Sequence, residues 1–242
     1  MKRLTAISGF SRRLSCAFGL LVFASACGPS INQAAKADID RRVASLSTSA
    51  QGFPAPIAFE PMPVAVGQWA EYWVADDKGE PSFMRMKVVG ESSGAHWFEI
   101  ESETYFGKSA MLYLMSFGDR KNIDTIEIKT VRQMDNDGKV QEFPPELIGM
   151  MQSIYKKNLG VLIISWENKP QEDATSPAGK FSSCYKVKSD VAIMGYNSSS
   201  MSWSHPSIPL SGMVKSEGID NKNTMVLTGF GTAGAKSVFP GM

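Results

Sequence analysis

Alternation of side chains between two faces, which begins near Val64, is the feature that most constrains the fold of this chain. In residues 67–74, one face takes Trp69, Glu71 and Trp73, and the other takes Ala70, Tyr72 and Val74. A period of two is typical of half-buried β-strands. Asp76-Asp77-Lys78-Gly79 then supplies turn residues. The pattern predicts a strand that ends in a tight turn.

Similar stretches, separated by turn residues, recur along the rest of the chain. Strands are predicted at residues 83–89, 96–105, 110–117, 123–132, 139–143, 161–166, 179–191, 198–204, 212–217 and 223–231. Short strands with short joints predict an antiparallel meander. We interpret Asp135-Asn136-Asp137-Gly138 as a hairpin turn. The alternative, a calcium site, lacks the remaining spaced carboxylates and the terminal Glu of an EF-hand loop.

Residues 144–160 have helical periodicity instead. Pro144 and Pro145 suit a helix start, and Gly160 suits its end. The apolar residues at helical spacing are Leu147, Met151, Ile154 and Tyr155. Such a stripe needs a partner surface. The predicted fold class is therefore mainly β (α+β): a long antiparallel curved sheet or half-barrel with one amphipathic helix packed on its inner face.

The N-terminus has the parts of an export signal: basic residues, an apolar run, and small residues before a cleavage site. The apolar run is about 13 residues, shorter than the roughly 20 of a membrane-spanning helix. Ala24-Ser25-Ala26-Cys27 resembles the lipobox of bacterial lipoproteins, which implies cleavage between Ala26 and Cys27 and acylation of Cys27. Gly28, the residue after Cys27, resembles the residue at this position in lipoproteins that are sent to the outer membrane. The alternative is an ordinary secretory signal.

These features predict three segments: a signal peptide (1–26), a lipidated cysteine with a flexible tether (27–61), and a single β-rich domain (62–242). The tether is rich in Ser, Ala, Gln and Pro, and residues 37–46 could form a helical turn or two. Cleavage removes four of the 25 basic residues and none of the 24 acids, so the formal charge becomes −3. This balance lacks the basic excess that nucleic-acid binding needs.

Cleavage and acylation also leave Cys184 alone, because Cys16 lies in the signal. No intramolecular disulfide is then possible. We interpret Cys184 as a buried, inert thiol, because no basic or helix-start environment is evident that would stabilise a thiolate. A reactive thiol is the alternative.

No metal, cofactor or catalytic motif is found. His96 and His205 have no ligand-spaced partner and are interpreted as strand-boundary residues. Glu99, Glu101 and Glu103 share one face of a strand, with Phe98 and Ile100 on the other. Carboxylates in this arrangement could serve acid–base catalysis, as in glycosidases. We favour the simpler interpretation, a solvated sheet face.

The chain contains 14 methionines, many in predicted elements. Flexible thioethers suit adaptable surfaces that accept varied apolar ligands. We favour the simpler interpretation, ordinary core filling, over a ligand pocket. The candidate ligand-binding residues are Trp69, Trp73, Met84, Met86, Met111 and Met151.

An acylated cysteine, the strand Gly67-Gln68-Trp69-Ala70-Glu71-Tyr72-Trp73, a long sheet and one helix together resemble the LolA/LolB-like superfamily of bacterial envelope proteins. The segment from Trp203 to Lys215 is similar to the late strand pairs of such sheets. The resemblance implies an incomplete barrel over an apolar cavity that accepts acyl chains.

Two functions follow from these observations. The first is a membrane-anchored, non-catalytic envelope protein that binds a lipid or other apolar ligand. The second is a structural or protein-interaction module of the envelope, with a protein partner. An envelope hydrolase that uses Glu101 is a more distant third.

Overall fold

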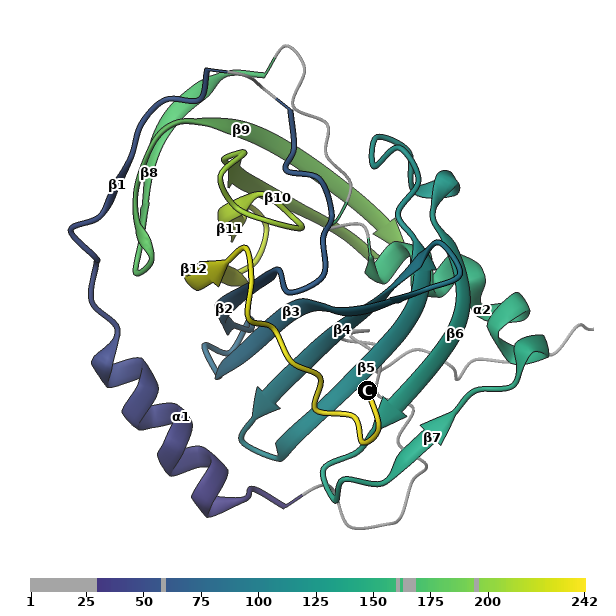
Figure 1. The fold of residues 1–242 in the computed structure, drawn as a ribbon. Coiled ribbons are helices and arrows are strands. Elements are labelled where there is room, and N and C mark those ends of the chain that lie inside the picture. Colours follow the sequence, from purple (N-terminus) through teal and green to yellow (C-terminus); the bar gives the residue numbers. More distant parts are fainter. Residues whose placement is uncertain (1–29, 58–59, 160–161, 163–168, 194–195) are drawn as a thin grey trace, which may run out of the picture.

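The computed structural model describes residues 30–57, 60–159, 162, 169–193 and 196–242. Within these residues the protein is mainly β and forms a 12-stranded, open, curved sheet (Figure 1). The predicted fold class is confirmed. No helix in the described residues is both long enough and apolar enough to cross a membrane.

The sheet is almost entirely antiparallel. Its order is β1-β9-β10-β11-β12-β2-β3-β4-β5-β6-β7, and β8 pairs with β9 beside this path. Only β1 with β9 is a parallel pair among the described strands. The strands are β1 (Gly52–Phe53), β2 (Trp69–Ala75), β3 (Pro81–Ser92), β4 (Ala95–Thr104), β5 (Gly107–Ser116), β6 (Glu127–Met134), β7 (Val140–Glu142), β8 (Gln171–Ser176), β9 (Gly179–Ile193), β10 (Tyr196–Ser204), β11 (Met213–Gly218) and β12 (Thr224–Gly231).

Most strands match their predicted positions, with three differences among the described residues. The strands β1 and β8 were not predicted from the sequence. The predicted strand 123–132 begins instead with a 3-10 turn, η1 (Ile123–Thr125), because the Asn122 side chain accepts a bond from the Asp124 amide and caps it. The predicted strand 161–166 lies outside the described residues except for Leu162, which is buried. The hairpin turn at Asp135 is confirmed, since Gly138 N donates to Asp135 O at 3.0 Å.

One hydrophobic core lies against what we call the inner face of the sheet, the face that carries Ala70 and Tyr72. Its buried side chains come from strands at both ends of the curl: Phe181 from β9, Val214 from β11, Met86 from β3, Phe98 from β4 and Val131 from β6. The loop that follows β10 enters this core as well, and the Tyr72 hydroxyl lies 2.7 Å from Ser211 Oγ there. The curved sheet is therefore packed, not hollow, along most of its inner face.

Helix α2 (Pro145–Asn158) packs against β6, as Figure 1 shows. Ile148, on its first turn, is buried in the core, and Leu159 follows the helix into the same cluster. The Gln152 amide donates to Ile128 O at 2.8 Å. The predicted helix is thus present and contributes to the core of the inner face.

Helix α1 (Gln33–Ser45) is longer than the turn or two predicted, and it is packed where a flexible coil was expected. The Asn32 side chain caps its start by accepting bonds from the amides of Ala34 and Ala35. Ile39 is fully buried, and the Arg42 guanidinium lies 3.6 Å from the centre of the Phe83 ring. The sequence does not predict this packing, because α1 presents little apolar surface and is held largely by charged contacts.

Candidate functional site

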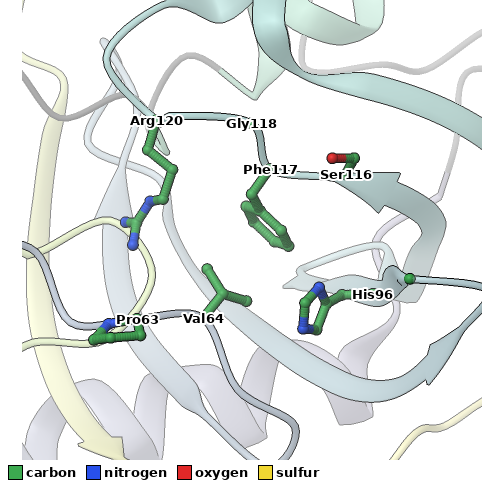
Figure 2. A pocket seen from close by; sticks show the side chains of 8 residues that line it. Pro63, Val64, His96, Ser116, Phe117, Gly118 and Arg120 are labelled. Carbon is green, nitrogen blue, oxygen red and sulfur yellow. The ribbon is translucent and has the colours of Figure 1, made fainter.

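A pocket of about 360 Å³ lies where β4 begins and β5 ends (Figure 2). Its lining comes from three segments: the chain before β2, the β3–β4 turn with the start of β4, and the chain that follows β5. The lining residues are Pro63, Val64, Gly94, His96, Ser116, Phe117, Gly118 and Arg120. A volume of this size is at the lower end of small-molecule sites.

The wall that follows β5 depends on a tight turn. Gly118 has a φ of +57°, and a Cβ there would lie 2.2 Å from Thr125 Oγ1, so only glycine fits. The Asp119 carboxylate accepts bonds from the amides of Lys121 and Asn122 and from the Thr125 hydroxyl. These bonds, the backbone ones first, hold the pKa of Asp119 below its ordinary value. The turn therefore fixes the position of Arg120.

Arg120 is the charged residue of the pocket wall, and it is 7% exposed. Its Nη1 donates to Met62 O at 2.9 Å, and its Nη2 donates to Leu210 O. Burial lowers the pKa of its guanidinium to about 10, so the group remains charged at neutral pH. Its backbone has a φ of +58°, a left-handed conformation that costs a non-glycine residue about 1 kcal/mol.

The other lining side chains are mixed: Pro63, Val64 and Phe117 are apolar, whereas His96 and Ser116 are polar. Phe117 is buried, and its ring meets the His96 ring edge-on at 5.8 Å and the Phe98 ring at 5.7 Å. Val64 lies between Arg120 and His96 in Figure 2, with the Phe117 ring above it. The arrangement places one buried cation at the margin of an apolar wall.

None of the six predicted ligand-binding residues lines this pocket. The register of β2 with β3 places Trp69 opposite Lys87 and Ala70 opposite Met86, so the tryptophans and the methionines occupy opposite faces. Trp69 and Trp73 lie on the outer face, whereas Met84 and Met86 are buried in the inner core. Met111 packs partly buried against that core. Met151 lies in α2, and its side chain is outside the described part of the structure.

The six residues remain a prediction, and the sequence itself did not indicate this pocket. Phe117 ends the predicted strand 110–117, whereas nothing in the local sequence around Arg120 indicates that its side chain is buried. The one available signal was Gly118-Asp119, a turn pair that reverses the chain. Even that signal does not show which side chains the turn carries inward.

The carboxylates of β4 are not on a solvated face, which corrects the sequence-based interpretation. Glu99 is fully buried and Glu103 is 9% exposed. Phe98 and Ile100 are turned into the core, as predicted. Glu99 lies 2.6 Å from Lys87 Nζ, and Lys87 also pairs with Glu101. The acids are committed to ion pairs and do not form an open acid–base site.

Two other segments cover this outer face. Arg42 of α1 pairs with Glu103 at 2.6 Å and with Glu71 at 3.0 Å. The C-terminal segment crosses the middle strands (yellow in Figure 1). Its Ser237 hydroxyl donates to Glu99 at 2.5 Å, and Lys87 Nζ donates to Lys236 O at 2.7 Å. Residues far apart in the sequence therefore close the face that alternation alone would leave exposed.

His205 follows the end of β10, as predicted, but it is buried and both of its ring nitrogens are used. Nε2 lies 3.1 Å from Pro54 O, and Nδ1 accepts from the Ser207 amide at 3.2 Å. This pattern requires a neutral ring with its proton on Nε2. Burial lowers the pKa of His205 below its ordinary value of 6.5.

The lowered pKa predicts an acid-sensitive contribution to stability. Below pH 6.5 the unfolded chain takes up this proton before the folded chain does, so the free energy of unfolding falls as the pH falls. We expect His205→Gln to cost about 1 kcal/mol at pH 7, from a lost hydrogen bond, and to reduce the loss between pH 6.5 and 5. Urea unfolding at several pH values measures this, and parallel pH curves for the two proteins would contradict it.

Cys184 is buried, and its Sγ donates to Phe181 O. Burial raises the pKa of its thiol to about 12, so almost no thiolate exists at neutral pH. This agrees with an inert thiol. The lipobox residues, Ala26 and Cys27 included, lie outside the described residues. The described residues contain no cluster of three or more His, Cys, Asp or Glu side chains able to hold a metal ion.

Comparisons of this chain with protein-family models, with curated proteins and with solved structures give no significant match.

Proposed function

We propose that the protein is a lipid-anchored component of the bacterial cell envelope, held at the outer membrane through Cys27, and that its β domain binds a lipid or other apolar ligand without catalysing a reaction. The observation that carries the binding function is the pocket, with Phe117 and Val64 in its lining. The sequence supports the anchor, because Ala24-Ser25-Ala26-Cys27 resembles a lipobox. A LolA/LolB-like relationship is part of this proposal.

The packed inner face restricts the ligand. Met84 and Met86 are buried among other core side chains, so they offer no room for a long chain. A pocket of about 360 Å³ suits a small apolar molecule or a single chain of modest length. The ligand would bind beside the start of β4 and the end of β5, and the side chains of the core would keep their positions.

The anchor is tested by Cys27→Ser. We expect this variant to lose palmitate labelling and to move from the membrane fraction to the soluble fraction, because acyl chains supply the membrane affinity. A variant that remains membrane-bound and fully processed would overturn the anchor.

The binding function is tested by filling the pocket. Val64→Trp is expected to weaken binding of a fluorescent fatty acid at least tenfold, measured by polarisation on the soluble Cys27→Ser chain. The matched control is Val66→Trp, two residues further along the chain at a side chain that is 48% exposed. Equal binding by both tryptophan variants would exclude this pocket as the site.

The sheet edge supports a second function, a protein-interaction module. Strand β7 ends the described sheet on one side, and all three of its residues are exposed. Exposed edges offer unpaired backbone groups to another chain. Crosslinking from Val140 in intact cells that returned one stoichiometric protein partner would favour this function over ligand binding.

A further inference from the structure

Arg120 is a buried cation that has no carboxylate partner in the described part of the chain. Its two hydrogen bonds go to backbone carbonyls, and burial is the cause of its lowered pKa. Lys87, the other strongly buried cation of the described residues, pairs with Glu99 and Glu101. Buried charges in proteins are normally paired. Arg120 departs from that rule, and it does so on a pocket wall.

The guanidinium also keeps unused donors. It has five N–H groups. One bond goes to Met62 O and one to Leu210 O, while Nε is buried with no acceptor. Neutral carbonyls satisfy a donor but leave the positive charge uncompensated. A bound anion would supply both the missing charge and the missing acceptor.

The backbone adds a second cost at the same residue. Arg120 has a φ of +58°, in the region that favours glycine. Strained backbone positions cluster at active sites and ligand sites. Leu210, whose carbonyl Arg120 binds, has a φ of +64° as well, so two strained residues meet at this point.

We propose that Arg120 is the anion subsite of the pocket, and that it binds the carboxylate of a single-chain amphiphile whose apolar part lies against Phe117 and Val64. This inference rests on the proposed ligand-binding function and specifies its ligand class. A single cation matches a monoanion, and the planar guanidinium fits a carboxylate well. Pro63, Val64 and Phe117 then provide the apolar surface for the chain of the ligand.

The test compares three single-chain probes of similar chain length that differ in their head: decanoate, decanol and decyltrimethylammonium. Each is titrated below its micelle concentration or solubility limit into the Cys27→Ser chain at pH 7.5 by calorimetry. We expect decanoate to bind at least tenfold more tightly than decanol, and the cationic probe to bind more weakly than both. Equal affinities for decanoate and decanol would overturn the anion subsite while leaving apolar binding intact. Failure of all three probes would instead remove the proposed function.

Variants then assign the preference to Arg120. Arg120→Met is expected to abolish the tenfold preference for decanoate, with decanol affinity within about threefold of the parent chain, and Arg120→Lys is expected to retain part of the preference. The matched control is Lys129→Met, which removes one positive charge from an exposed position of β6. If Arg120 only clamps the carbonyls of Met62 and Leu210, Arg120→Met will lower stability and leave the preference unchanged. If Arg120→Met does not fold, the role of Arg120 is decided by comparing the preference for decanoate over decanol in the parent chain and in Arg120→Lys.

Competition with inorganic phosphate or acetate distinguishes a site for free anions from a site for the head of an amphiphile. Because the proposal requires the chain as well as the charge, millimolar acetate or phosphate is expected to displace decanoate only weakly. If acetate or phosphate displaced decanoate at the concentration at which decanoate itself binds, the proposal that the ligand is an amphiphile would be overturned.

Discussion

Replacing Lys87 with methionine is expected to lower the free energy of unfolding by about 3–5 kcal/mol. Lys87 is 4% exposed and lies 2.6 Å from Glu99, which has no exposed surface. The variant would leave the Glu99 carboxylate with the Ser237 hydroxyl and the Val238 amide as its described partners. Two neutral donors do not compensate a buried negative charge, so most of the desolvation cost of Glu99 would appear as lost stability.

Urea unfolding of the soluble chain at pH 7 measures this loss as a change in the transition midpoint. The control is Lys108→Met, which breaks a pair between Glu103 and a lysine that is 72% exposed. Because this lysine is largely solvated and Glu103 keeps Arg42 as a partner, we expect the control to lose about 0–1 kcal/mol. A Lys87 variant that lost no more than the Lys108 variant would show that water reaches Glu99.

A double variant distinguishes the effect of the lost charge from the effect of the lost packing. Lys87→Met with Glu99→Leu removes both charges, and an apolar replacement of a whole buried pair is often nearly neutral. We therefore expect the double variant to recover most of the stability lost by Lys87→Met. Additive losses from the two substitutions would contradict this, because they would mean that packing and not charge dominates.

The middle of the sheet could be predicted from sequence because its signal is local. Each strand from β2 to β5 spans seven residues or more, β2 alternates between two faces, and turn residues separate the strands. Such a pattern shows which residues share a face but not what covers that face. The Glu99 face was therefore interpreted as solvated, although residues 237–239 and α1 cover it. That covering depends on contacts between distant residues, 138 positions apart for Ser237 with Glu99 and 61 for Arg42 with Glu103.

Strand β1 shows what a local sequence pattern cannot predict. β1 has two residues and pairs with Lys180 and Phe181 of β9, so its strand character exists only in the folded protein. Phe53 of β1 stacks on Phe181 with ring centres 4.4 Å apart, and this contact, not an alternating pattern, holds the segment. No propensity argument over two residues would find it.

The candidate ligand-binding residues follow from residue type, which does not show which residues line a pocket. Met84 and Met86 lie in the buried core beside Tyr72 and Ala70, which agrees with the favoured interpretation of the methionines as core filling. The pocket instead depends on a turn at Gly118 that aims Arg120 inward. A turn can be predicted from sequence, whereas the burial of the next charged side chain depends on the carbonyls that it meets.

Phe98→Ala is expected to lower the free energy of unfolding by about 3–5 kcal/mol, the usual range for a fully buried phenylalanine. Phe98 has no exposed surface and packs against Phe117 and Tyr113 at ring-centre distances of 5.7 Å and 6.4 Å. The substitution removes a ring from a filled interior, and the surrounding strands cannot collapse onto the space. Urea unfolding measures the loss, with Phe106→Ala at a ring that is 38% exposed as the control.

The same substitution discriminates a packed interior from a lipid cavity. If the inner face were an open apolar cavity, removing one ring from its wall would cost little and would admit a larger ligand. A loss below about 1 kcal/mol, together with tighter binding of a long-chain fatty acid, would therefore contradict the packed core. Because Phe117 also lines the pocket, Phe98→Ala is expected to weaken decanoate binding by freeing that ring, without changing the preference of Arg120 for a carboxylate over an alcohol.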